Sequence, residues 1–155
     1  HFHNVLCLSE AKGMDIIMAK LITSETFDFH RFGYHFTLCF PKSLLCLDGD
    51  SGTGKSLMSK ALQEYLSQYR SDFKLQVFNY RTSIASLRSF LDTMTNTLTI
   101  IDNADILIKT REDVDRLYTS DNQIVLLGRR MNFYRLGYES CGFIRSDGLE
   151  IYTEY

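Results

Sequence analysis

Residues 49–56 read Gly-Asp-Ser-Gly-Thr-Gly-Lys-Ser and match the pattern G-x-x-x-x-G-K-[ST] at every fixed position. The apolar run Ser43–Leu47 precedes them, and a pattern of helical period follows them. Glycines at 49, 52 and 54 allow the backbone to approach a ligand closely and to aim successive N–H groups into one concavity. The first turn of the following helix adds unpaired N–H groups and the positive end of its dipole. The stretch therefore predicts a strand, an anion-binding turn and a helix, in that order.

Two side chains in this stretch suit a polyphosphate and its metal ion. Lys55 supplies a mobile positive charge for β- and γ-phosphates, and the Ser56 hydroxyl is placed to coordinate Mg²⁺. We therefore expect ATP and Mg²⁺ as cofactors. The predicted cofactor contacts are Gly49, Asp50, Ser51, Gly52, Thr53, Gly54, Lys55, Ser56 and Leu57.

An acidic residue follows a second apolar run, Leu98–Ile101. This residue, Asp102, comes after enough chain for a helix, a strand, a second helix and a further strand. With the first motif upstream, we expect Asp102 to contact Mg²⁺ through water, so that Ser56 and Asp102 hold the metal. The alternative is an aspartate that merely ends a strand.

Hydrophobic periodicity predicts the remaining elements. Apolar residues alternate over Thr26–Phe40, which indicates a hairpin that turns near Arg31 to Gly33, and a helical stripe covers Lys55–Tyr69. Ser83 and Thr110 are predicted helix caps, the first for a helix with Ile84, Leu87, Leu91 and Met94 on its apolar face. Further strands are expected at Lys74–Tyr80, Asn96–Ile101 and Gln123–Leu127, and a second hairpin around Ser146–Gly148 with Leu149, Ile151 and Thr153 alternating.

The segments GDSGTGKS at 49–56 and LTIIDNAD at 98–105 resemble the P-loop NTPases, and within them the ATPase division that includes AAA-type proteins. The resemblance covers residues 43–130. It implies an α/β three-layer sandwich with a mostly parallel sheet, in which a further strand lies between the strand before the P-loop and the strand before Asp102. Gln123–Leu127 is similar to that strand, which often ends in a polar sensor residue. We expect the N- and C-terminal segments to add antiparallel strands at the margins.

The chain departs from this division directly after Asp102. Many of these ATPases have a glutamate there that polarises the attacking water, whereas this chain has Asn103. Asp105 is a candidate replacement for that base, and the alternative is a helix-capping or surface aspartate. Arg129 and Arg130 are candidates for sensing the γ-phosphate, and the alternative is a solvated pair. The predicted catalytic residues are Lys55, Asp102, Asp105 and Arg129.

Composition limits the partners. The chain of 155 residues is 45% hydrophobic and 23% charged, which predicts a single folded domain over 1–155, with residues 1–18 interpreted as a tag, an extension or disordered. A net charge of −2 gives no basic field for nucleic acid or anionic membrane, and no apolar run is long enough to span a bilayer. The four cysteines form no C-x-x-C pair, which favours reduced thiols in a cytoplasmic protein.

Three functions fit these observations. The leading hypothesis is a small cytoplasmic Mg-ATP-binding protein, a slow ATPase that acts as a nucleotide-dependent switch or as an accessory to a protein partner. ATP is preferred over GTP because the motifs N-K-x-D and D-x-x-G are absent. One alternative is a small-molecule kinase, for which Arg111 and Arg116 lie in a plausible lid region. The other is a nucleotide-binding module that does not hydrolyse ATP.

Overall fold

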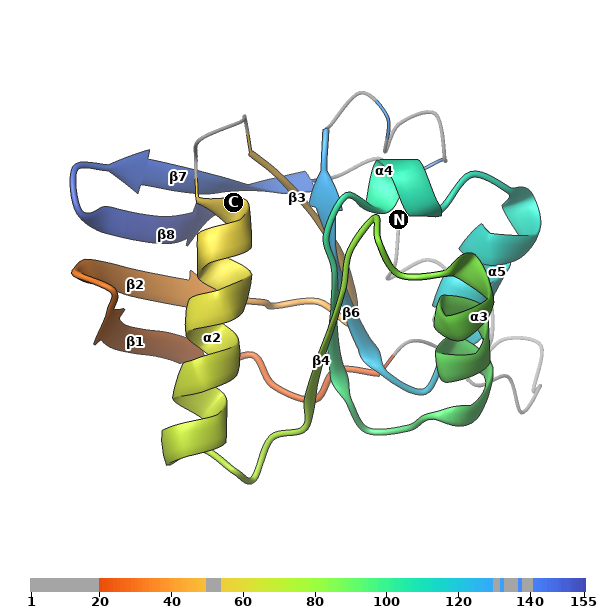
Figure 1. The fold of residues 1–155 in the computed structure, drawn as a ribbon, viewed down its shortest axis with the longest axis horizontal. Helices are drawn as coiled ribbons and strands as arrows, with labels where there is room; N and C mark the ends of the chain where they lie inside the picture. Colours follow the sequence, from red (N-terminus) through yellow and green to blue (C-terminus); the bar gives the residue numbers. More distant parts are fainter. Residues whose placement is uncertain (1–19, 50–53, 130–131, 133–136, 138–140) are drawn as a thin grey trace.

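The computed structural model describes residues 20–49, 54–129, 132, 137 and 141–155. This part of the chain has an α/β fold, in which eight strands form one curled sheet with parallel and antiparallel pairs (Figure 1). The strand order is β1-β2-β8-β7-β3-β6-β5-β4. The strands are β1 (Thr26–Arg31), β2 (Tyr34–Cys39), β3 (Leu44–Asp48), β4 (Leu75–Phe78), β5 (Leu98–Ile101), β6 (Gln123–Gly128), β7 (Cys141–Asp147) and β8 (Glu150–Glu154).

The helices in the described part of the chain are α2 (Lys55–Tyr69), α3 (Ile84–Thr93), α4 (Ala104–Leu107) and α5 (Arg111–Thr119). The bounds of α2 are those predicted from the apolar stripe. The short helix α4 was not predicted, because four residues carry too little periodicity to be detected. Among the described residues, no helix combines the length and the apolar character that a bilayer crossing requires.

The central strands confirm the predicted order. β6 lies between β3 and β5 and pairs parallel with both, and β4 pairs parallel with β5. The strand predicted at Gln123–Leu127 therefore separates the strand before the glycine-rich stretch from the strand before Asp102. Most of the ladders in the sheet are parallel, as expected.

The two terminal hairpins add the expected antiparallel strands, but they share one side of the sheet. β1 pairs antiparallel with β2, and β7 pairs antiparallel with β8. β7 also pairs parallel with β3, and β2 pairs parallel with β8. Both hairpins therefore lie on the β3 side of the sheet, and β4 forms the opposite edge.

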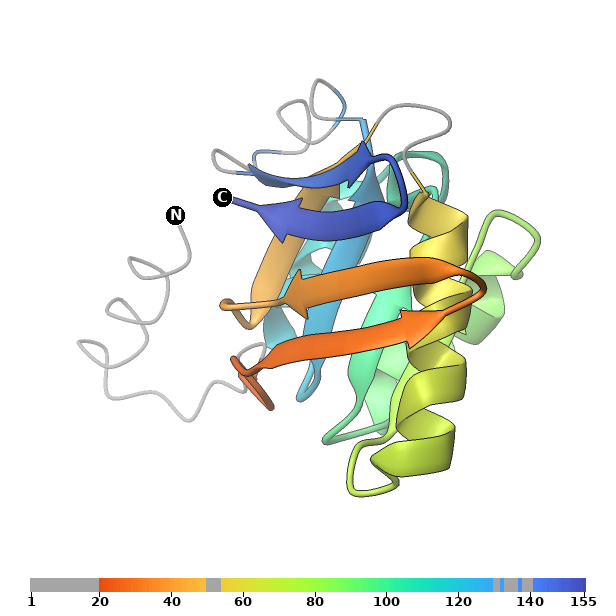
Figure 2. The same ribbon diagram turned by 90° about the vertical axis from the view of Figure 1, so that its left-hand side faces the viewer.

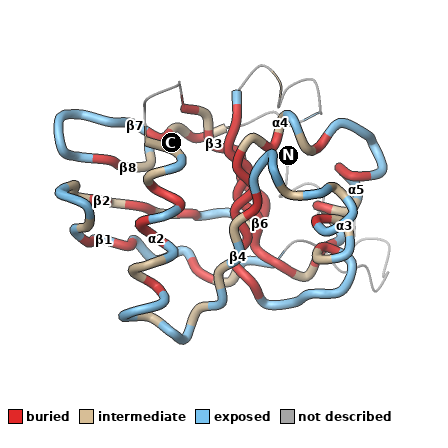
Figure 3. Tube along the Cα trace, viewed as in Figure 1, coloured by how far each residue is buried: buried red, intermediate tan, exposed pale blue. Residues whose placement is uncertain are grey.

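Both faces of the central strands are buried (Figure 3). In β3, Leu45 and Leu47 face the core that contains Met58 and Leu62 of α2, whereas Leu44 and Cys46 face a second core with residues of α3 and α5. The first core also contains residues of β5 and β6 and of both hairpins, which lie beside α2 (Figure 2). This helix therefore packs against the parallel and the antiparallel parts of the sheet together.

The two predicted helix caps are confirmed, whereas two apolar residues lie outside the elements in which they were expected. The Ser83 hydroxyl accepts a hydrogen bond from the Ser86 N–H at 3.1 Å, and the Thr110 hydroxyl accepts one from the Asp113 N–H at 3.2 Å. Met94, expected on the apolar face of α3, instead ends that helix and is 43% exposed. Leu149, expected in the strand β8, lies in the turn beside Gly148 and is 65% exposed, because β8 begins only at Glu150.

Candidate functional site

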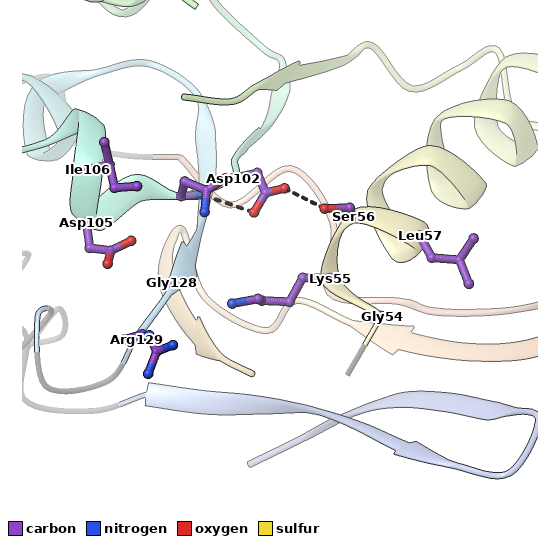
Figure 4. A pocket seen from close by; sticks show the side chains of 10 residues that line it. Gly54, Lys55, Ser56, Leu57, Asp102, Asp105, Ile106, Gly128 and Arg129 are labelled. Atoms are coloured by element: carbon purple, nitrogen blue, oxygen red, sulfur yellow. Dashed lines mark hydrogen bonds between the residues drawn. The ribbon is translucent and has the colours of Figure 1, made fainter. Parts of the chain in front are cut away.

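A pocket of about 470 Å³ opens where β5 and β6 end and α2 begins (Figure 4). Its lining combines the end of the glycine-rich stretch with residues that follow β5 and β6. The carboxyl ends of parallel strands are the usual position of ligand sites in α/β proteins. The lining residues are Gly54, Lys55, Ser56, Leu57, Asp102, Asn103, Asp105, Ile106, Gly128 and Arg129.

Gly54 fixes the start of α2. It has φ 92° and ψ 20°, a left-handed conformation that favours glycine. A side chain at this position would also meet Ile151 of β8, since a Cβ built on Gly54 would lie 2.9 Å from Ile151 Cδ1. The last glycine of the motif is thus required both by its backbone conformation and by the close approach of the β7–β8 hairpin.

The two sequence motifs meet at one hydrogen bond. Ser56 Oγ donates to Asp102 Oδ2 at 3.1 Å, and Asp102 Oδ1 accepts from the Asn103 N–H at 2.9 Å (Figure 4). Asp102 is only 8% exposed, whereas Ser56 is exposed at the first turn of α2. Asn103 has φ 54°, a left-handed conformation that asparagine tolerates better than most residues. That turn directs the chain away from β5 into α4.

This pair suits a hard cation. Mg²⁺ prefers oxygen ligands and usually takes one or two from a protein while it keeps waters and substrate phosphates. The Ser56 hydroxyl and the Asp102 carboxylate supply oxygen donors at one edge of the pocket. The residues predicted to hold Mg²⁺ are therefore brought together, and their chemistry fits that ion.

Positive charge lies on the other side of the pocket. The Lys55 amine extends from α2 toward the end of β6, where Gly128 and Arg129 lie (Figure 4). Gly128 is buried and Arg129 is exposed. A bound polyphosphate would therefore meet a lysine from one element and an arginine from another, both of which line the pocket.

Asp105 also lines the pocket, from the first turn of α4. Its Oδ2 atom accepts a hydrogen bond from Asn132 Nδ2 at 2.7 Å. Asn132 was not predicted, because a single polar residue beyond a strand has no recognisable spacing. The next residue, Ile106, is 49% exposed and lines the same pocket, and it was not predicted either.

Several predicted residues fall elsewhere. Asp50, Ser51, Gly52, Thr53 and Arg130 lie outside the described residues, while Gly49 is buried directly after β3. Arg111 and Arg116 do not line the pocket. Arg111 pairs with Asp115 at 3.3 Å, and Arg116 pairs with Glu112 at 2.8 Å.

Comparison with known proteins adds no assignment, since neither a protein-family model nor a curated protein matches the chain.

Proposed function

We propose that the chain is a nucleotide-binding protein of the P-loop NTPase class, with the three-layer arrangement of that class around β3, β6 and β5. Within the class, we propose an Mg-ATP-binding protein of the ATPase division, with slow hydrolysis that serves as a switch for a protein partner. The strand order supports the class, because β6 lies between the strand that leads to the glycine-rich stretch and the strand that leads to Asp102.

The hydrogen bond between Ser56 and Asp102 carries the proposal. The two motifs lie 46 positions apart in the chain, yet their oxygen-bearing side chains come to 3.1 Å at the edge of a common pocket. Lys55 lies beside them at the start of α2. The pocket thus offers ligands for a cation and charge for an anion within one site.

Hydrolysis at such a site requires little covalent work from the protein. Water attacks the γ-phosphate in line, and catalysis comes from positioning and from neutralising negative charge. Lys55 and Arg129 supply positive charge, and bound Mg²⁺ would neutralise phosphate oxygens. Asp105 is the proposed base, held by Asn132, because its carboxylate lines the pocket and Asn103 occupies the position of the usual glutamate.

Thermal unfolding with and without Mg-ATP tests binding. A ligand at 100 times its Kd stabilises the folded state by about 2.7 kcal/mol, which raises Tm by about 5–10 °C for a chain of this size. Lys55→Ala should lose most of that rise. Lys60→Ala is the matched control, because Lys60 is exposed one turn further along α2 and lies over the Phe32 ring at 5.2 Å. An equal Tm rise in wild type and Lys55→Ala would refute the proposal.

Turnover distinguishes the ATPase from a module that only binds. The substitution of the usual glutamate by Asn103 is the observation that favours such a module. We expect slow ADP release from Mg-ATP in wild type and none beyond the Lys55→Ala background in Asp105→Asn, which should still bind nucleotide. If Asp105→Asn turns over at the wild-type rate, Asp105 is not the base.

A kinase would instead need an acceptor. ADP formation that depends on an added nucleoside, sugar or carboxylic acid, with a phosphorylated product, would replace the ATPase assignment. The ion pairs of Arg111 and Arg116 on α5 do not favour it, because neither side chain lines the pocket.

A further inference from the structure

Two cysteines form the first described rung between β3 and β7. Cys46 and Cys141 are in-register partners on these parallel strands, followed by Leu47 opposite Gly142 and Asp48 opposite Phe143. In-register residues on neighbouring strands lie about 4.8 Å apart, which is inside the Cα separation of about 4.4–6.8 Å that a disulfide spans. Both side chains belong to the same face of the sheet, with the core that α3 and α5 cover.

The two thiols already contact each other and differ in access. Their side chains share a hydrogen bond, and both cysteines are in the reduced form. Cys46 is fully buried, whereas Cys141 is half-buried. Burial raises the pKa of Cys46 well above its usual value, with a smaller contribution from the hydrogen bond to Cys141. An oxidant in solution therefore meets Cys141 before Cys46.

We propose that Cys46 and Cys141 form a reversible disulfide when a disulfide oxidant such as oxidised glutathione is present. This site does not depend on the proposed nucleotide chemistry. Cys39, the remaining cysteine among the described residues, lies on β2, and its sulfur donates to the Ser24 carbonyl at 3.3 Å. β8 and β7 lie between β2 and β3, so Cys39 has no comparable partner across a ladder.

The exchange balances in two steps. The Cys141 thiolate attacks one sulfur of oxidised glutathione, a protein–glutathione bond forms, and the other glutathione leaves as a thiolate that takes up the proton lost by Cys141. The Cys46 sulfur then attacks Sγ of Cys141, the bond to glutathione breaks, and the second glutathione leaves with the proton lost by Cys46. Two protein thiols are oxidised and one glutathione disulfide is reduced to two thiols.

The bond would cross-link β3, which leads into the glycine-rich stretch, to the β7–β8 hairpin, which packs against Gly54 at the end of that stretch. β3 ends at Asp48, directly before Gly49, and β7 continues into β8, where Ile151 lies against Gly54. A disulfide on the Cys46–Cys141 rung therefore ties both supports of Gly54 to each other. The two cysteines therefore lie on strands that also support the start of α2, where the pocket begins.

Oxidation of the full chain with glutathione disulfide, followed by thiol blocking and peptide mass mapping, tests the proposal. We expect a cross-linked Cys46–Cys141 peptide that dithiothreitol removes. Cys46→Ser should stop the reaction at a mixed disulfide of glutathione with Cys141, and Cys141→Ser should leave Cys46 reduced. Cys39→Ser is the matched control and should cross-link like wild type.

The wild-type measurement is decisive without any variant. Accumulation of the Cys141–glutathione adduct without ring closure would overturn the proposal. Cross-linking of Cys46 to another cysteine, or no reaction of Cys141, would overturn it as well. None of these readouts uses nucleotide, so the disulfide and the ATP site can fail independently.

Discussion

Ser56 Oγ lies 3.1 Å from Asp102 Oδ2, although 46 positions separate the two residues in the chain. The contact joins the first turn of α2 to the end of β5. The packing that brings these elements together is the parallel order of β3, β6 and β5. Their distance is therefore set by the whole central sheet rather than by either motif.

Asp102→Asn should separate metal binding from nucleotide binding. The amide keeps one acceptor oxygen, which can still accept from the Asn103 N–H, and its NH2 group can donate to the Ser56 hydroxyl, but it removes the negative charge that a cation requires. We expect the ATP affinity measured by calorimetry to fall about tenfold with Mg²⁺ present and to change little in a chelator. Asp115→Asn is the control for charge, because Asp115 is an exposed residue of α5. Equal losses with and without Mg²⁺ would contradict a metal role.

Gly54→Ala should cost more stability than Gly33→Ala. Both glycines have positive φ, 92° and 77°, and each alanine costs about 1–2 kcal/mol for this backbone conformation. A Cβ at Gly33 meets nothing within 4 Å, whereas one at Gly54 would lie 2.9 Å from Ile151 Cδ1. We expect an additional loss of about 1–3 kcal/mol for Gly54→Ala in urea unfolding.

Ile151→Val tests the origin of that additional loss. It removes Cδ1, so the double variant with Gly54→Ala should be less destabilised than the sum of the single changes. Simple additivity would show that the contact with Ile151 is not the cause.

Asp113→Asn should destabilise the fold near neutral pH. The buried carboxylate accepts hydrogen bonds from Arg88 Nε at 2.8 Å and Arg88 Nη2 at 2.9 Å, and from Arg116 at 3.0 Å. Charged hydrogen bonds of this kind contribute about 1–3 kcal/mol in total here, because Arg88 is partly exposed. We expect a lower midpoint of urea unfolding for Asp113→Asn, because the ion pair joins α3 to α5. The control is Asp115→Asn on the same helix, which should leave the midpoint near that of wild type.

The same carboxylate predicts an acid dependence. The hydrogen bonds from Arg88, more than those from Thr110 and Arg116, lower the pKa of Asp113 from 3.8. Its contribution is therefore fully present above the unfolded-state pKa and is lost as pH falls through the lower folded-state pKa. The difference in stability between wild type and Asp113→Asn should shrink in that acid range. A difference that stays constant down to the folded-state pKa would contradict this account.

His35 predicts a dependence of opposite sign. Its Nε2 atom lies 2.5 Å from Asp28 Oδ1 and its Nδ1 atom lies 2.7 Å from Glu150 Oε2, and the hydrogen bond to Asp28 is the main cause that raises the pKa of His35 above 6.5. The protonated ring joins β1, β2 and β8. Its stabilisation is fully present below the unfolded-state pKa and is lost as pH rises through the folded-state pKa.

The measurement is urea unfolding of wild type and His35→Gln across that pH window. Wild type should lose stability relative to His35→Gln as pH rises. His30→Gln is the control, because His30 is the exposed register partner of His35 and stacks on it at 4.4 Å. If His30→Gln removes the pH dependence and His35→Gln keeps it, the assignment to His35 is wrong. A proton NMR titration of His35 reports its pKa directly.

Local patterns predicted local structure well. The apolar stripe of α2 and the cap at Ser83 were read correctly because helical period and side-chain capping act within a few residues. The predictions that placed Met94 in a helix and Leu149 in a strand were wrong for a related reason. The apolar pattern continues past the point where a helix or a turn ends, and hydrophobicity alone does not locate that end.

Contacts between residues that lie far apart in the chain were harder to predict from the sequence. The order of β3, β6 and β5 followed from the resemblance, but no local pattern indicated that β7 pairs with β3 and places both hairpins on one side. The contact of Ile151 with Gly54 and the hydrogen bond of Asn132 to Asp105 depend on that arrangement. Such contacts join residues far apart in the chain, so they follow from the assembled sheet and not from spacing.

The β7–β8 hairpin is held by β3 on one flank and by β2 on the other, and its side chain Ile151 fills the space in front of Gly54. A shift of this hairpin along its neighbours would therefore also move the Ile151 side chain that lies against the start of α2. The packing of the hairpin and the backbone at the start of α2 are therefore coupled through one apolar side chain.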